Sequence, residues 1–364
     1  LAMNGRPGPV WLDIPLDVQG AFIEEDELIG FDKEKYEAGE DGWAYESPYK
    51  TDLDDKTKLD LSDMPKPLSD EVLKEIVEKI KNSKRPVFNA GNGIRIGNAH
   101  KEFLELADLL NIPVVVGWNS EDCMWVDHPL YAGRPGNFGD RPGNFTVQNS
   151  DLVLSVGSRL SLRQVGFNCK GWAREAFTIV NDIDGEELKK PTVHIDIPIH
   201  ADCKVFMRQL IDFLKKEKTP VFEGGKGLYD MSWTETVKYW LKKYPVCKDE
   251  FLQNDDSKKA NVYAFIKYIG DSAKENQITV VGNGSACVVG GHSYIIKKGQ
   301  RFISNSAVAS MGYDLPAAIG AYMANLDGKR YDKELILITG DGSIQMNLQE
   351  LQTIVHHRMN IKIF

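Results

Sequence analysis

Short apolar strands alternate with amphipathic helices between residues 69 and 214, and this alternation constrains the fold more than any other feature. Apolar residues at helical spacing follow Ser69, a suitable helix cap, and another helix is expected at 100–110. The expected strands lie at 85–91, 112–117, 151–157, 177–183 and 192–197. Because these strands are apolar throughout, they predict a parallel sheet covered on both faces. The predicted fold class is therefore α/β, with doubly wound, Rossmann-like sheets.

The same alternation returns in the last third of the chain. Helices are expected at 233–244, 261–273 and 315–326, and strands at 278–282 and 334–340. One further helix is predicted from a single apolar stripe, which consists of Ile344, Leu348, Leu351 and Val355. Ile361 to Phe364 are expected to begin a buried strand. We predict a central domain at 69–215, a linker and helix at 216–256, and a second α/β domain at 257–364.

The opening residues suggest a neighbouring domain. The stretch "PGPVWLDIP" is typical of a short strand, but no partner strand precedes it, and a lone strand cannot fold. We expect residues 1–20 to be the end of a domain that lies upstream, and the acidic residues 21–68 to form a linker. The chain is interpreted as an interior piece of a longer protein.

Charge and cysteine content exclude several classes of protein. The net charge is −9, without a long basic run, so a nucleic-acid partner is not expected. No apolar stretch approaches the roughly 20 residues that cross a bilayer, so no membrane partner is expected. The five cysteines are scattered and form no CxxC pair, which indicates reduced thiols in the cytoplasm and argues against a zinc site or disulfides.

A strand followed by Gly340, Asp341, Gly342 and Ser343 offers a possible phosphate site. Ligands of open α/β sheets bind at the carboxyl ends of strands, and helix N-termini present N–H groups to phosphate. A carboxylate at this place would repel phosphate unless a cation such as Mg²⁺ lay between them. The residues therefore allow a Mg²⁺–diphosphate site. The alternative is an Asp-Gly turn with Asp341 as a helix cap.

Two further glycine-containing stretches have the same character. In "VVGNGSACVVGG", a strand ends in a loop whose Gly284 and Ser285 can aim N–H groups at phosphate. In "SNSAVASMGYDLPAAIGA", small residues surround one large apolar residue, Met311, before a helix. A tight turn or ordinary core packing is the alternative for each.

These motifs resemble thiamine-diphosphate-dependent enzymes of the acetolactate synthase (acetohydroxyacid synthase) group. "GRPGPVWLDIPLDVQ" resembles the end of the pyrimidine-binding domain, and "RPVFNAGNG" through "PIHAD" resembles the central domain. "ASMGYDLPAAIGA" followed by "GDGSIQMNLQELQT" resembles the diphosphate-binding domain, which would be incomplete here. The resemblance spans essentially the whole chain.

The resemblance implies roles for individual residues. Asp341 would be a Mg²⁺ ligand, Met311 would support the bent cofactor, and the carbonyl of Ala309 would accept a hydrogen bond from its aminopyrimidine. The residues implied to hold the diphosphate are Gly284, Ser285, Gly340, Gly342 and Ser343. No catalytic residue is assigned in this chain, because the family's catalytic glutamate belongs to the upstream domain. An asparagine that completes the Mg²⁺ shell is expected further downstream.

In the central domain the resemblance implies an FAD site. The matching residues are Gly91, Gly93, Arg159, Asp182 and Asp202. However, the family's phosphate stretch is altered here to "YAGRPGNFGDRPGNF". Two readings stay open: bound FAD, or no flavin with or without another adenine nucleotide. Arg134 and Arg141 would contact a nucleotide or lie solvated in loops.

The function implied is thiamine-diphosphate- and Mg²⁺-dependent decarboxylation of a pyruvate-like 2-oxo acid, with carboligation to a second carbonyl. Simple decarboxylation, or a keto-sugar as acceptor, is an alternative. A non-catalytic nucleotide-binding or assembly module is the alternative from another class, while a pyridine-nucleotide dehydrogenase is poorly supported. A homodimer or homotetramer is implied, and this chain alone is expected to be inactive.

Three other side chains have simpler interpretations. His356 and His357 are expected to be a solvated pair at the end of the last helix. Cys287 lies near the second phosphate loop, but its default role is that of a small buried hydrophobic residue.

Overall fold

A computed structural model of the chain describes residues 11–24, 26, 67–217, 222, 224–253, 259–326 and 328–364. The chain divides into two units, residues 1–64 and 65–364. In the first unit, α1 (Leu16–Gln19) is a single helical turn, and Trp11–Pro15 form no strand. The strand prediction is wrong for these residues, because no described strand pairs with them. Residues 1–10 and nearly all of the predicted linker lie outside the described residues.

A five-stranded parallel sheet forms the first half of the second unit, in the order β2-β1-β3-β4-β5. Its strands are β1 (Pro86–Ala90), β2 (Val114–Val116), β3 (Leu152–Val156), β4 (Phe177–Asp182) and β5 (Ile197–His200). Its helices are α3 (Asp70–Asn82), α4 (Gly93–Ile96), α5 (His100–Leu110), α6 (Arg141–Gln148), α7 (Leu162–Val165), α8 (Gly185–Lys189) and α9 (Cys203–Glu217). Every residue of β1 and β3 is buried, as the continuous apolar runs predict.

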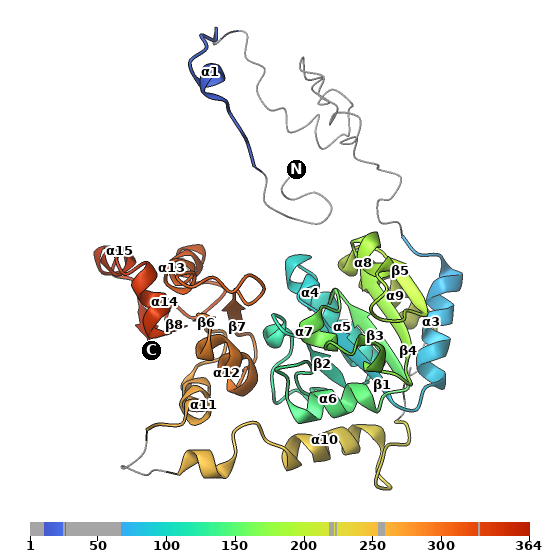
Figure 1. Cartoon of the computed structure of the whole chain (residues 1–364). Helices are drawn as coiled ribbons and strands as arrows, with labels where there is room; N and C mark the ends of the chain where they lie inside the picture. Colours follow the sequence, from blue (N-terminus) through green and yellow to red (C-terminus); the bar gives the residue numbers. More distant parts are fainter. Residues whose placement is uncertain are drawn as a thin grey trace. The chain divides into compact units, whose positions relative to one another are not determined.

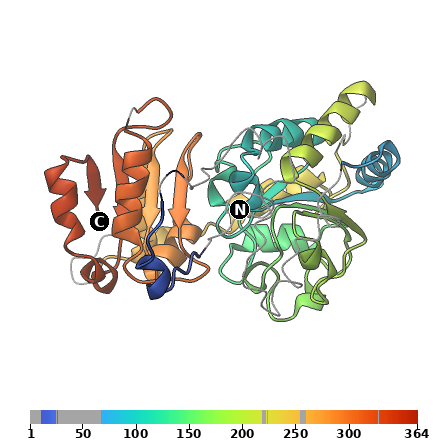
Figure 2. The same ribbon diagram turned by 90° about the horizontal axis from the view of Figure 1, so that it is seen from above.

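A four-stranded parallel sheet forms the second half, in the order β7-β6-β8-β9. Its strands are β6 (Ile278–Val281), β7 (Arg301–Ser304), β8 (Leu335–Ile338) and β9 (Ile361–Ile363). Its helices are α11 (Val262–Ser272), α12 (Ser285–Ser293), α13 (Asp314–Ala324), α14 (Asp341–Met346) and α15 (Glu350–His356). Figures 1 and 2 show helices packed around both sheets, which confirms the α/β prediction.

Between the two sheets in sequence, α10 (Trp233–Lys243) packs on the first half through aromatic side chains. Trp233 is fully buried, stacks edge-on against Trp240, and donates from Nε1 to the carbonyl of Pro86 at 2.9 Å. Short 3₁₀ turns lie at Glu121–Cys123, Cys169–Gly171 and Asp249–Leu252. None of the helices in the described ranges is long and apolar enough to cross a bilayer.

In both sheets the order in which successive strands are added reverses next to one inner strand. In the first sheet β2 lies on one side of β1 and β3 on the other, and in the second sheet β7 and β8 flank β6 in the same way. At such a switch point the loops that leave neighbouring strands run to opposite faces, which opens a crevice at the carboxyl edge. The sheet topology therefore nominates the ends of β1 and β3, and of β6 and β8, as binding sites.

Three local predictions need correction. The strand expected at 192–197 is β5, displaced to Ile197–His200; Pro198 is tolerated because β5 pairs only with β4. The last predicted helix is divided into α14 and α15, and Leu348 and Val355 are exposed. The helix is interrupted at Asn347, whose backbone is not helical and whose side chain donates a hydrogen bond to the carbonyl of Gly312. Ile361–Ile363 form a partly exposed strand at one edge of the described sheet, not a buried one.

Candidate functional site

Three loops meet at the carboxyl edge of the four-stranded sheet. The β6 loop (282–284), the β7 loop (305–313) and the β8 loop (339–340) each follow a buried or half-buried strand. Because all strands of this sheet are parallel, their carboxyl ends lie at one edge. The β6 and β8 loops belong to the two strands at the switch point. The three stretches that the sequence nominated are thus brought together.

Side-chain hydrogen bonds connect the three loops. Asn283 Nδ2 donates to the carbonyl of Ser310 at 2.6 Å, which joins the β6 and β7 loops. The N–H of Gly312 donates to Ser343 Oγ at 2.9 Å, and Asn347 Nδ2 donates to the Gly312 carbonyl at 2.6 Å. These two bonds join the β7 loop to α14. Ser343, predicted to hold the diphosphate, is buried and positions a loop in this structure.

Asp314 is the buried centre of this arrangement. Its side chain accepts a hydrogen bond from Thr339 Oγ1, at the end of β8. A Cβ atom at Gly282 would overlap the Asp314 carboxylate, so only glycine allows this approach. Asp314 therefore joins the β8 loop to the start of α13 and packs closely against Gly282 of the β6 loop.

Left-handed backbone occurs in two of the loops. Gly284 has φ +70° and Gly312 has φ +83°, a conformation that glycine adopts without steric cost. Ala309 has φ +59°, which is unfavourable for a residue with a Cβ atom. Strained residues of this kind cluster at functional sites. The strain at Ala309 is consistent with a loop shaped for its carbonyl or its neighbour Met311.

The surface of the three loops is open and supplies hydrogen-bond donors. Gly284, Ser285, Ala309 and Asp341 are exposed, and the Met311 side chain is 53% exposed. A Cβ atom at Gly284 would have no neighbour within 4 Å. The first N–H groups of α12, a nine-residue helix, follow directly and have no partners within the helix. This edge can therefore bind an anion in the manner of helix N-termini.

Asp341 is an exposed carboxylate directly after the β8 loop. It is the first residue of α14, and its side chain makes no hydrogen bond or ion pair with any described residue. The described residues contain no group of three or more His, Cys, Asp or Glu side chains that could hold a metal ion by themselves. Mg²⁺ commonly takes one or two carboxylates and completes its shell with phosphate oxygens and water. A single carboxylate beside an anion cradle fits this mode.

The glycines at the switch point of the first sheet are used for packing. The N–H of Gly91 donates to the Val156 carbonyl and that of Gly93 to the Gly157 carbonyl, both at 2.9 Å. A Cβ atom at Gly93 would lie 2.8 Å from the Gly157 Cα atom. Close contact between β1 and β3 thus accounts for both glycines without a nucleotide. A nucleotide-binding role for them stays a prediction.

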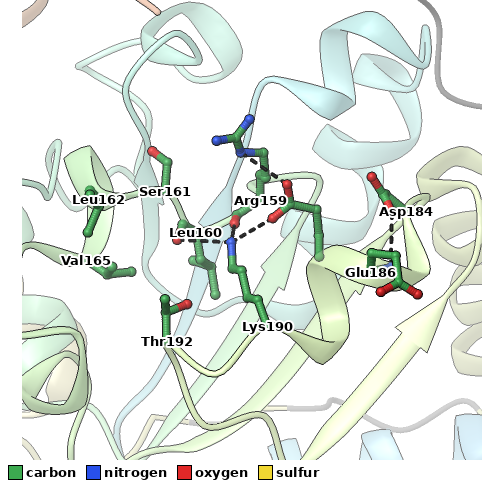
Figure 3. Close-up of a pocket in the computed structure, with 10 residues that line it drawn as sticks. Arg159, Leu160, Ser161, Leu162, Val165, Asp184, Glu186, Lys190 and Thr192 are labelled. Carbon is green, nitrogen blue, oxygen red and sulfur yellow. Dashed lines mark hydrogen bonds and ion pairs between the residues drawn. The ribbon is translucent and has the colours of Figure 1, made fainter.

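A cavity of about 360 Å³ lies beyond the ends of β3 and β4 (Figure 3). Arg159 lines it and faces Glu187, with Arg159 Nε 3.4 Å from Glu187 Oε1. Lys190 Nζ lies 2.8 Å from Glu187 Oε2. Because both cations contact Glu187, a pyrophosphate here would have to compete with this carboxylate. Binding of FAD by these residues stays a prediction.

The other predicted nucleotide contacts have structural roles. Asp202 caps α9 by accepting from the N–H groups of Lys204 and Val205, and Asp182 accepts from the N–H of Asp184. Arg134 is buried and donates to the carbonyls of Gly291 and Tyr294 at 3.0 and 2.9 Å. The prediction that Arg134 lies solvated in a loop is therefore wrong, and contact with a nucleotide stays a prediction. Arg141 is exposed at the start of α6.

The three side chains with simpler interpretations behave as predicted. Cys287 is 5% exposed, and burial raises the pKa of its thiol to about 11. His356 and His357 are exposed, with their rings in edge-to-face contact.

Comparisons with known protein families agree with the position of the three loops. Residues 73–210 match the model of the thiamine pyrophosphate enzyme, central domain, and residues 282–364 match that of the thiamine pyrophosphate enzyme, C-terminal TPP binding domain. The two matches together cover more than half of the chain. The chain belongs to the thiamine pyrophosphate enzymes. The match to the C-terminal domain begins at Gly282, the first residue of the β6 loop, and includes the β7 and β8 loops.

Several acetolactate synthase large subunits are similar in sequence to this chain along its whole length. The chain is 33% identical over 370 residues to a probable acetolactate synthase large subunit from Methanocaldococcus jannaschii. It is 30% identical to the protein of the same name from Methanococcus aeolicus, and 26% identical to the acetolactate synthase isozyme 1 large subunit of Escherichia coli. These alignments cover 100% of this chain but only 55 or 56% of each relative. The chain thus spans a little over half the length of these thiamine pyrophosphate enzymes.

Sequence reasoning missed the polar residues that arrange the loops of this thiamine pyrophosphate enzyme. Asn283, Asp314 and Asn347 are described above, and Asn119 accepts hydrogen bonds from Ser304 and Ser306 at the start of the β7 loop. Asn283 and Asp314 lie within two positions of a glycine of the loops, and Asn347 lies five positions after Gly342, but short polar residues near glycines are too frequent to be diagnostic. Asn119 is distant in sequence from the β7 loop, so only the tertiary structure identifies it.

Glu121, which follows β2, is a buried carboxyl group that makes the stability of the protein depend on pH. It is 3% exposed, and one carboxylate oxygen has no hydrogen-bond partner among the described residues. Burial, opposed by backbone N–H groups and Arg134, raises the pKa of Glu121 from 4.5 to about 7. The folded protein therefore keeps a proton that the unfolded chain releases, and the free energy of unfolding falls as pH rises from about 4.5 to 7.

Glu121→Gln is expected to remove this contribution to the pH dependence. At pH 8 the variant should be more stable than the parent by about 2–3 kcal/mol, and near pH 4.5 the two should be nearly equal. Urea unfolding at both pH values measures the difference. Glu175→Gln, at an exposed side chain, is the matched control. Parallel pH profiles for parent and Glu121→Gln would show that the buried carboxyl is not protonated.

Proposed function

We propose that this chain is the central and diphosphate-binding part of an enzyme that uses thiamine diphosphate and Mg²⁺ to decarboxylate a 2-oxo acid and join the remaining fragment to a second carbonyl. The convergence of the three loops at the switch point of the second sheet is the observation that carries the proposal. Similarity to acetolactate synthase large subunits supports pyruvate or a closely related acid as the donor.

The residues of the three loops fit the cofactor's diphosphate. Gly284, Ser285 and the first N–H groups of α12 would bind its oxygens, and Asp341 would bind Mg²⁺ between carboxylate and diphosphate. Met311, whose Cε atom lies where a Gly342 side chain would stand, would support the cofactor from the β7 loop. When bound, thiamine diphosphate supplies the electron sink that decarboxylation of a 2-oxo acid requires.

The protein's own contribution is to orient the reactants. The hydrogen bonds from Asn283, Asn347 and the N–H of Gly312 keep the loops in one arrangement before any ligand binds. Preorganisation of this kind reduces the entropic cost of bringing two carbonyl compounds together. No step of the proposed reaction is assigned to a flavin.

Other parts of the protein complete the proposal. The catalytic glutamate and the remaining Mg²⁺ ligand would come from sequence outside this chain, so the chain alone would be inactive. The exposed loop surface supports an active site shared between subunits of a homodimer or homotetramer. The free cysteines among the described residues are consistent with a cytoplasmic location.

An assay of the full-length protein tests the proposed reaction. With pyruvate, thiamine diphosphate and Mg²⁺, we expect CO₂ release that requires both cofactors, together with acetolactate as product. Acetaldehyde as the sole product would identify a simple decarboxylase, and product formed only with an added keto-sugar would identify that acceptor class. Absence of CO₂ release from pyruvate and other 2-oxo acids, with the cofactors bound, would contradict the carboligase and favour a non-catalytic module.

A further inference from the structure

A second cavity lies on the opposite edge of the four-stranded sheet from the three loops. It has a volume of about 350 Å³ and is lined by Ile278 and Arg301, the first residues of β6 and β7. The loops of the proposed diphosphate site follow the carboxyl ends of the same strands. The cavity is therefore a separate place in the fold.

Three arginines line this cavity. Arg95 follows β1 in the first half of the unit, Arg301 begins β7, and Arg330 lies before β8. Arg95 Nε lies 3.0 Å from Asp122 Oδ1, and Arg301 Nη1 bonds the other carboxylate oxygen of Asp122. The Asp122 side chain itself is only 1% exposed. One buried carboxylate thus orients two guanidinium groups without covering the cavity.

The charge around the cavity is positive on balance. Within the described part of the chain, Arg330 has no carboxylate partner, and its guanidinium carbon lies 5.3 Å from the centre of the Tyr331 ring. Three cations against one carboxylate leave two positive charges. The carboxyl end of α13, at Ala324 and Asn325, adds only about half a negative charge. His100 is neutral at pH 7, because burial and the nearby Arg95 lower its pKa to about 4.

One wall of the cavity is apolar. It consists of Ile278, Ile303, the Tyr331 ring and the small side chains of Ala321 and Ala324. A volume near 350 Å³ is at the lower end of the range for small-molecule sites. Guanidinium groups bind phosphate through paired N–H donors, and two net charges match a dianion.

We propose that this cavity binds a small phosphate monoester, whose dianionic phosphate contacts Arg95, Arg301 and Arg330 and whose apolar group lies against Ile278 and Tyr331. Since the lining comes from both halves of the unit, a bound ligand would connect the α4–α5 region with β7 and α13. The site is independent of the proposed reaction and would exist whether or not the enzyme binds thiamine diphosphate.

Calorimetry with phenyl phosphate tests the site in the full-length protein saturated with thiamine diphosphate and Mg²⁺, and again without them. We expect binding under both conditions, tighter than that of inorganic phosphate, with none detectable for phenol. Arg330→Gln should weaken phenyl phosphate binding about tenfold, the loss of one charge-assisted hydrogen bond. Arg174→Gln, at an arginine 59% exposed elsewhere, is the matched control and should change nothing.

A second pair of variants keeps the test independent of arginine. Ala324→Glu places a carboxylate at the cavity and should abolish binding, whereas Ala324→Gln, of nearly equal size, should retain most of it. Circular dichroism melts establish that the variants fold. Absence of phenyl phosphate binding to the parent, or equal affinities in the parent and Arg330→Gln, would overturn the proposal. Equal weakening by Arg174→Gln would show non-specific attraction to surface charge.

Discussion

Asp341→Ala is expected to weaken thiamine diphosphate binding in the presence of Mg²⁺ by at least about 100-fold, or about 3 kcal/mol. Asp341 directly follows the β8 loop as the first residue of α14, and its side chain is exposed. Without it, the divalent ion would lose its carboxylate ligand and bind the diphosphate less tightly, leaving mainly the neutral N–H groups to hold the diphosphate. Calorimetry of the full-length protein with and without Mg²⁺ measures both effects.

The control for this variant is Asp70→Ala. Asp70 is also the first residue of a helix, α3, and is exposed, so both substitutions remove the same kind of charge from a helix start. Neither side chain is buried, and both variants should fold with nearly parental stability. Mg²⁺-dependent affinity that is equal in Asp341→Ala and Asp70→Ala would rule out Asp341 as the metal ligand.

The second large effect concerns the stability of the first sheet. Gly91→Ala is expected to reduce the free energy of unfolding by about 3 kcal/mol or more. Its Cβ atom would overlap the backbone of Gly157 and Ser158, and backbone cannot rotate away as a side chain can. The hydrogen bond from the Gly91 N–H to the Val156 carbonyl would be displaced with it. Urea unfolding followed by circular dichroism measures the loss.

Gly320→Ala is the matched substitution, because it adds the same methyl group to a glycine of the other half. Gly320 lies inside α13, and its added Cβ atom has no neighbour within 4 Å. Alanine has a higher helix propensity than glycine, so this variant should gain up to about 1 kcal/mol. If Gly91→Ala unfolds at the same urea concentration as the parent, the contact between β1 and β3 does not require glycine at this position. Packing would then not explain Gly91, and the predicted nucleotide-binding role would have to be tested.

The helices and strands with strong periodicity could be predicted from sequence. For α3, four of the five predicted apolar positions, Leu73, Ile76, Val77 and Ile80, are buried, and the fifth, Val72, is half-buried. Partly exposed edge strands could not be predicted with the same accuracy: β7 was missed and β5 was displaced, whereas the fully buried edge strand β2 was found. A partly exposed strand carries little continuous apolar pattern in its sequence, and its position depends on the register of its partner.

The residues of the candidate site also fall into those that sequence reasoning nominated and those that it missed. The glycines, Met311 and Asp341 could be found because phosphate binding requires small residues and a cation ligand at strand ends, and these types are visible in the sequence. The hydrogen bonds of Asp314 and Asn347 could not be found, because many aspartates and asparagines occur in ordinary turns and helix ends without such a role. The same limit applied to Arg134, whose donors turned out to bond the carbonyls at the end of α12.

The sequence by itself determined the α/β class, the strand-end glycine loops and the resemblance to thiamine-diphosphate enzymes, since each depends on local residue types and spacing. Only the tertiary structure decided that the three loops meet at one switch point, that Gly91 and Gly93 serve packing, and that Arg95, Arg301 and Arg330 surround one cavity. These arginines are separated by more than 200 residues from first to last. Their proximity follows from the pairing order of the strands and from the buried Asp122, which bonds two of them.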